Sequence, residues 1–181
     1  PARLVANPGC YPTSAILAMA PVVQLSIIEP DVIIDSKSGV SGGGRTLNMT
    51  NHFSEVNENV FAYGLSGHRH LPEITQELGA LTQERLSITF VTHLIPMTRG
   101  ILSTCYAHSR PGRLEDGDAG VKQLREVYQD FYANHPFVRI TTQPPQTKQT
   151  LGNNVCLLYP TLDQRTGRVV VISCLDNLVK G

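Results

Sequence analysis

The cysteine at position 10 stands where a thiol can act as a nucleophile. It follows an Asn7-Pro8-Gly9 turn and precedes a helix-forming run in which Pro12 suits the first turn. Backbone N–H groups and the positive end of the helix dipole would point at the sulfur of Cys10 and favour the reactive thiolate. Cys10 is therefore a candidate nucleophile. The alternative is a buried residue that merely begins a helix.

Two neighbouring histidines, His68 and His70, offer a base. His70 directly precedes a helix predicted to start at Leu71-Pro72-Glu73, whose positive end disfavours the imidazolium and keeps the ring neutral and able to exchange a proton. The polar surroundings are equally compatible with a solvent-exposed pair. Metal binding by this pair together with His52 or His93 is a third interpretation, although no spaced carboxylate or cysteine ligands support it.

The densest glycine cluster of the chain runs from Ser38 to Arg45. It has neither the G-x-G-x-x-G order and strand-loop-helix context of a dinucleotide site nor the pattern of a P-loop. Its small residues still allow a ligand to approach the backbone, and Arg45 could pair with a phosphate or carboxylate. Arg99, after a predicted strand, could do the same. For each arginine, a solvated surface position is the alternative.

The elements that must position these groups can be predicted from periodicity and turn signals. Strands are expected at 3–6, 32–34, 86–92, 101–108, 138–142, 154–159 and 168–174, helices at 12–23, 72–79 and 118–134, and loops at 36–45 and 143–150. The apolar stripe of the third helix should cover one face of a sheet. Successive strands with few helices between them favour an α+β fold, with a mostly antiparallel mixed sheet and helices packed on one face.

The composition limits the classes of partner. The chain has 181 residues, is 41% hydrophobic, and balances 15 basic against 15 acidic residues, so it lacks the charge of a nucleic-acid binder. The apolar stretch from Ala15 to Val23 is interrupted by Pro21 and falls short of the roughly 20 residues of a membrane span. We therefore expect neither nucleic acid nor a membrane as partner.

The ends of the chain and its other cysteines suggest a compartment. No signal peptide is visible, and the first residue is Pro1 in place of an initiator methionine, so we expect the natural start to lie upstream. Cys105 and Cys174 lie in strand-like runs and are expected to be buried, and no C-x-x-C pair includes them or Cys156. Reduced thiols favour a cytoplasmic protein.

Five segments, spread over the chain, carry a family resemblance. They are Ala6-Asn7-Pro8-Gly9-Cys10-Tyr11-Pro12-Thr13, Ser38-Gly39-Val40-Ser41-Gly42-Gly43-Gly44-Arg45, Gly67-His68-Arg69-His70-Leu71-Pro72-Glu73-Ile74, Pro96-Met97-Thr98-Arg99-Gly100-Ile101-Leu102 and Asp176-Asn177-Leu178-Val179-Lys180-Gly181. In these segments and their order the chain resembles the N-acetyl-gamma-glutamyl-phosphate reductases. That resemblance implies a glyceraldehyde-3-phosphate dehydrogenase-like C-terminal domain and NADPH-dependent reduction of N-acetyl-gamma-glutamyl phosphate to the semialdehyde, a step of arginine biosynthesis, through a cysteine thioester.

The resemblance also implies roles for single residues. It makes Cys10 the nucleophile and His70, or alternatively His68, the acid/base; it places Ser38 and Gly39 near the nicotinamide, Asn177 over the cofactor, and Arg45 and Arg99 near the substrate anions. The family enzyme begins with an NADP-binding Rossmann domain and continues into a helix after Gly181, and neither is present. We therefore expect residues 1–181 to be the catalytic, substrate-binding and dimerisation domain of a homo-oligomer, inactive alone, with NADP(H) bound mainly by the missing domain.

Two alternatives to this function remain. The similar reductase of lysine biosynthesis through a carrier protein shares the cysteine and Gly-His-Arg-His segments, but a carrier would call for a basic docking surface that this neutral chain does not show. A non-catalytic dimerisation module would have an inert thiol at Cys10, so a thiol-reactivity assay separates it from an enzyme.

Overall fold

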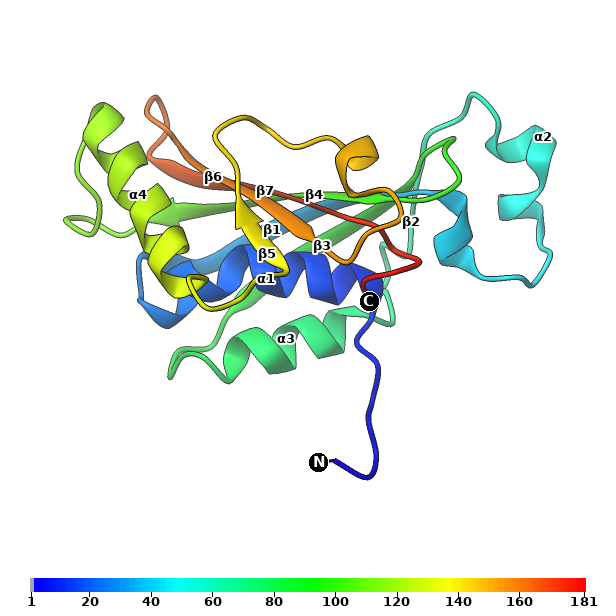
Figure 1. Cartoon of the computed structure of the whole chain (residues 1–181), viewed down its shortest axis with the longest axis horizontal. Coiled ribbons are helices and arrows are strands. Elements are labelled where there is room, and N and C mark those ends of the chain that lie inside the picture. Colours follow the sequence, from blue (N-terminus) through cyan, green and yellow to red (C-terminus); the bar gives the residue numbers. More distant parts are fainter. Residues whose placement is uncertain (1) are drawn as a thin grey trace.

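The computed structural model describes residues 2–181 and is built around one seven-stranded sheet (Figure 1). The strands are β1 (Ile28–Ser38), β2 (Phe61–Tyr63), β3 (Ser87–Leu94), β4 (Ile101–Ser109), β5 (Val138–Ile140), β6 (Cys156–Asp163) and β7 (Arg168–Leu175). The helices are α1 (Cys10–Gln24), α2 (Phe53–Val56), α3 (Leu71–Gly79) and α4 (Gly117–Phe131), with 3-10 turns η1 (Val40–Gly43), η2 (Met49–Asn51) and η3 (Thr147–Thr150).

The sheet has the order β2-β3-β1-β4-β7-β6-β5. β1 pairs with β3 and β5 with β6 in parallel, whereas the other neighbours are antiparallel, so the predicted mostly antiparallel mixed sheet is confirmed. Ser38 at the end of β1 lies opposite Ile101 at the start of β4, which lies opposite Leu175 at the end of β7. Three loops distant in sequence therefore leave the sheet at one edge.

The three long helices lie on one side of the sheet, as predicted. α1 packs across β1, β4 and β7, α4 packs on β5 and β6 and touches α1, and α3 lies against α1 on its side away from the sheet (Figure 1). The hydroxyls of Tyr128 on α4 and of Tyr132, the C-cap of α4, donate to the carbonyl oxygens of Ala18 and Leu17 on α1, at 2.5 and 2.7 Å. These bonds hold the two helices together over the core.

A buried hydroxyl network fixes α1 against the sheet. Ser14 on α1 lies 2.9 Å from the hydroxyls of both Ser103 on β4 and Ser173 on β7, and Ser103 lies 2.7 Å from Ser36 on β1. All four side chains are fully buried. An unsatisfied buried hydroxyl costs about 1–3 kcal/mol, so the network disfavours any shift or rotation of the helix. Cys10 begins this same helix, one turn before Ser14.

No α-helix of residues 2–181 covers the opposite face of the central strands; the loop with η3 packs on this face only near the end of β7, where Sγ of Cys174 lies 3.6 Å from the carbonyl oxygen of Pro145. Side chains alternate along a strand, and Ile33, Tyr106 and Val170, which lie side by side on β1, β4 and β7, are only half-buried and turn to this second face. The molecule thus presents a partly apolar sheet surface.

Some predicted elements differ from the structure. The strand expected at 3–6 is wrong: these residues pair with no other strand, and Leu4 and Val5 are exposed. The loop expected at 36–45 is wrong at both its start and its centre, because Ser36–Ser38 complete β1 and η1 follows. β2 and α2 were not expected; β2 is only three residues long and owes its existence to pairing with β3.

Candidate active site

Cys10 is the first residue of α1, with Gly9 as the N-cap; the helix begins two residues before its predicted start, and Cys10 lies at its N-terminus as expected. The side chain is partly buried. Burial raises the pKa of its thiol above the usual value, although backbone N–H groups of Tyr11 and of Cys10 itself act in the lowering direction. The charge of Arg69 also lowers the pKa, and that of Glu73 raises it. The helix N–H groups thus favour the thiolate as expected, but desolvation outweighs them, so the net shift of the Cys10 pKa is upward.

His70 is the N-cap of α3, and its ring reaches the turn that precedes Cys10. A methyl group added at Gly9 would come within 2.8 Å of Nε2 of His70, so only glycine allows this approach. Nδ1 of the same ring is buried without a hydrogen-bond partner among the described residues. Burial, followed by the charge of Arg69, lowers the pKa of His70, which agrees with the neutral ring expected.

The ring of His68 is surrounded by three aromatic rings. Its ring makes edge contacts with Tyr11, Tyr63 and Phe90, with ring centres 5.5–5.6 Å apart. Nδ1 of His68 accepts the backbone N–H of His70 at 3.1 Å, which makes Nε2 the protonated nitrogen of the neutral ring. Burial lowers the pKa of His68, and the charges of His70 and Arg69 add to this. His68 thereby holds the loop that carries His70.

Glu73 was missed as a site residue. Its carboxylate accepts the backbone N–H of Gly9, at 3.1 Å to Oε1 and 3.2 Å to Oε2, and so ties α3 to the start of α1. In the sequence, Glu73 carries only the signal of an acidic residue in a first helical turn. The contact spans 64 positions, which no local pattern reveals.

The glycine-rich loop, Arg99 and Asn177 meet at the edge of the sheet. Gly39 lies so close to Arg99 that an added Cβ would be 2.7 Å from the Arg99 backbone nitrogen. The amide of Asn177 accepts the N–H of Gly100 at 2.6 Å and donates to the hydroxyl of Ser41 at 3.1 Å. The structure therefore brings this predicted group together.

The last residues of the chain connect the two groups. A Cβ on Gly181 would lie 2.5 Å from Cα of Cys10, so the segment after Asn177 runs back to the nucleophile candidate. Ser38 is buried at the end of β1, and its hydroxyl donates to the carbonyl of Gly39 at 2.9 Å.

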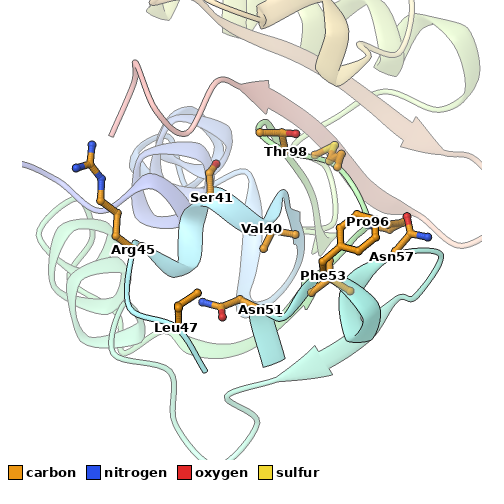
Figure 2. A pocket seen from close by; sticks show the side chains of 12 residues that line it. Val40, Ser41, Arg45, Leu47, Asn51, Phe53, Asn57, Pro96 and Thr98 are labelled. Atoms are coloured by element: carbon orange, nitrogen blue, oxygen red, sulfur yellow. The ribbon is translucent and has the colours of Figure 1, made fainter. Parts of the chain in front are cut away.

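Arg45 stands apart from these groups. It lines a cavity of about 460 Å³ formed by the loop after β1, by η2 and α2, and by residues 96–98. Figure 2 shows its guanidinium turned away from the side chains of Phe53 and Asn57 across the cavity. Within the described residues Arg45 makes no ion pair.

The family model described as "semialdehyde dehydrogenase, dimerisation domain" matches residues 10–177. The chain therefore belongs to this family. Two solved structures with the same fold are aspartate semialdehyde dehydrogenase II from Vibrio cholerae (TM-score 0.69, 14% identity, 98% of this chain and 58% of that one) and a probable aspartate-semialdehyde dehydrogenase from Pseudomonas aeruginosa (0.70, 15%, 98% and 58%).

Curated relatives point to one branch of the family. Proteins named N-acetyl-gamma-glutamyl-phosphate reductase are 55% identical in Pelotomaculum thermopropionicum, 50% in Dehalococcoides mccartyi and 52% in Moorella thermoacetica. Each alignment covers 99% of this chain and 51% of the relative, so the chain spans about half the length of these relatives. Among residues 2–181, no helix is long and apolar enough to cross a membrane.

Proposed function

We propose that residues 1–181 are the catalytic, substrate-binding and dimerisation part of an NADP-dependent N-acetyl-gamma-glutamyl-phosphate reductase of arginine biosynthesis, whose nucleotide-binding Rossmann domain lies in the other half. The observation that carries the proposal is the position of Cys10 at the N-terminus of α1 with Nε2 of His70 against the preceding Gly9. The shared name of the curated relatives supports the choice of substrate.

In the proposed reaction, Sγ of Cys10 attacks the carbonyl carbon of the acyl phosphate. The thiol proton passes to His70, the bond between the acyl carbon and the phosphate oxygen breaks, and an acyl thioester on Cys10 and inorganic phosphate result. Backbone N–H groups of Cys10 and Tyr11 are placed to stabilise the oxyanion that develops. Burial raises the pKa of Cys10 and lowers that of His70, so both directions favour the neutral thiol and the neutral ring before the attack.

NADPH, when bound, supplies the hydride that reduces the thioester carbon. The protonated His70 delivers its proton to the resulting oxygen, giving a thiohemiacetal on Cys10. The same ring then takes the hydroxyl proton back as the carbon–sulfur bond breaks, which releases the semialdehyde and returns the proton to the Cys10 thiolate.

The residues around Gly42 fit one edge of a nicotinamide. An added Cβ at Gly42 would lie 2.8 Å from the Ser38 hydroxyl and 3.7 Å from Nδ2 of Asn177, so the glycine keeps a small cradle open between these polar groups. Nδ2 of Asn177 uses one N–H for Ser41 and keeps a second for a carboxamide. Ser38, Gly39 and Asn177 would thus border the nicotinamide, while the missing half holds the rest of the cofactor.

For the assembly and its compartment, we propose a cytoplasmic homo-oligomer. The open sheet face with Ile33, Tyr106 and Val170 supplies the surface for a second copy, and the family description names dimerisation. Four unpaired thiols fit a reducing compartment. Sedimentation of the full-length protein with Tyr106→Glu on this face should show dissociation; an unchanged oligomer would contradict the proposed interface.

The test of the proposed activity uses the full-length protein. NADPH oxidation should depend on N-acetyl-gamma-glutamyl phosphate, and mass spectrometry without NADPH should find the acyl group on Cys10. A protein that reduces only the carrier-linked substrate of lysine biosynthesis, or neither substrate, would overturn the assignment.

A further inference from the structure

Asp176, which directly follows β7, is a fully buried carboxylate with every oxygen occupied. Oδ1 accepts Nε of Arg99 at 3.0 Å and the backbone N–H of Leu178 at 3.0 Å, and Oδ2 accepts Nη2 of Arg99 at 2.8 Å and the N–H of Gly152 at 2.6 Å. Burial by itself would raise the pKa of Asp176, but these donors outweigh it and hold the pKa below the ordinary value. The carboxylate therefore stays charged.

The ion pair occupies only one edge of the Arg99 guanidinium. A guanidinium has two edges that can bind a carboxylate or phosphate with parallel N–H groups: one formed by Nε and one Nη, the other by the two Nη atoms. Asp176 takes the first edge through Nε and Nη2, and the Arg99 side chain is 29% exposed. The second edge remains available for another oxyanion.

The backbone around Arg99 is also fixed by contacts with other segments. Asn177, the neighbour of Asp176, accepts the N–H of Gly100, the neighbour of Arg99, and also bonds Ser41 in the glycine-rich loop. Gly39 packs directly on the Arg99 backbone. Contacts from the segment after β7 and from the glycine-rich loop therefore fix the direction in which the Arg99 guanidinium points.

We propose that Asp176 is a positioning residue that orients Arg99 so that its free edge binds an anionic group of the substrate, a phosphate or a carboxylate. This inference rests on the proposed function, because the proposed substrate, N-acetyl-gamma-glutamyl phosphate, carries both a phosphate and a carboxylate. A lysine at position 99 could not bind Asp176 and a second anion each through two parallel N–H groups, because its ammonium is a single point charge; an arginine can. Loss of Asp176 should weaken anion binding without touching the chemistry of Cys10.

The test compares variants of the full-length enzyme. Asp176→Asn removes the charge and puts an N–H donor against the guanidinium, so KM for the acyl phosphate should rise about tenfold, with kcat and KM for NADPH nearly unchanged. Asp163→Asn is the matched control: Asp163 forms the same fork with Nε and Nη2 of Arg165, at the opposite end of β7, and should leave all constants unchanged. In an Arg99→Lys background, Asp176→Asn should add no further rise in KM.

An unchanged KM for the acyl phosphate in folded Asp176→Asn would overturn the proposal, as would an equal rise in both KM values. If this variant does not fold, Asp176→Glu, which keeps the charge but displaces the carboxylate, decides by the same readout. If the wild-type enzyme does not reduce the acyl phosphate, the proposed function fails separately. Calorimetric titration with inorganic phosphate, compared between wild type and Asp176→Asn, then still decides the positioning role: weaker binding by the variant supports it, and equal binding overturns it.

Discussion

The carboxylate of Glu73 lies 3.1 Å from the backbone nitrogen of Gly9 and accepts its N–H. This N–H, shared between the two carboxylate oxygens, thus joins the helix that follows His70 to the helix that Cys10 begins. Because Glu73 also raises the pKa of Cys10 by its charge, it both aligns the two groups and disfavours the thiolate. In the proposed mechanism, Glu73 would therefore lower the reactivity of the free Cys10 thiol while it holds His70 in position.

Glu73→Gln should separate these two effects. The amide oxygen can still accept the N–H of Gly9, but the negative charge is gone, so the pKa of Cys10 should fall. The pH profile of iodoacetamide labelling of Cys10 in the isolated chain should therefore move to lower pH. Glu73→Ala, which removes charge and bond together, serves as the comparison. A profile that moves upward in Glu73→Gln would show that the charge of Glu73 is not felt at the sulfur.

Cys10→Ser in the full-length enzyme should abolish reduction of the acyl phosphate while the fold stays intact, because a hydroxyl is a far weaker nucleophile than a thiol assisted by His70. Steady-state kinetics and circular dichroism measure the two properties. Cys105→Ser and Cys174→Ser should keep the chemistry and lose stability, since both residues are buried. Turnover by Cys10→Ser at the wild-type rate would remove Cys10 from the mechanism.

His70→Asn should lower kcat about a hundredfold or more, and His68→Asn clearly less. The ring of His70 faces the residue before Cys10, whereas Nδ1 of His68 is already engaged by the His70 N–H. Rates of both variants, measured across pH, decide between them. A greater loss in His68→Asn would exchange the two roles, and no loss in either would assign the proton transfer to another group.

The isolated chain should neither bind NADPH tightly nor turn over, yet Cys10 should alkylate before the other cysteines. The pyrophosphate of the cofactor needs a strand-turn-helix motif that this chain lacks. Burial raises the pKa of Cys105 to about 12 and of Cys156 to about 11, and both are fully buried, whereas Cys10 is partly accessible. Calorimetric titration with NADPH tests the binding, and mass-spectrometric mapping of limited labelling tests the order in which the cysteines react. Micromolar NADPH binding would reveal a nucleotide site, and equally slow labelling of all thiols would make the reactivity of Cys10 dependent on the part of the relatives that this chain does not span.

Tyr128→Phe should destabilise the chain by about 1–2 kcal/mol, because the carbonyl of Ala18 on α1 loses its buried partner. Urea unfolding at neutral pH measures the change in the free energy of unfolding. Tyr159→Phe on the half-buried side of β6 is the control and should change it by a few tenths of a kcal/mol. Equal effects of the two variants would mean that the Tyr128 hydroxyl does not tie α4 to α1.

A helix just after the Asn7-Pro8-Gly9 turn and the amphipathic α4 were predictable from the sequence, because a turn before a helix and an apolar stripe are local patterns; α1 itself begins two residues before its expected start. The order of the strands was not, since β3 and β4 flank β1 through pairings that no neighbouring residues encode. The same holds for the contacts that make a site: Glu73 with Gly9 spans 64 positions and Arg99 with Asp176 spans 77. The raised pKa of Cys10 also needed the tertiary structure, because the helix N-terminus is written in local sequence, whereas the burial that outweighs it comes from segments folded over the thiol.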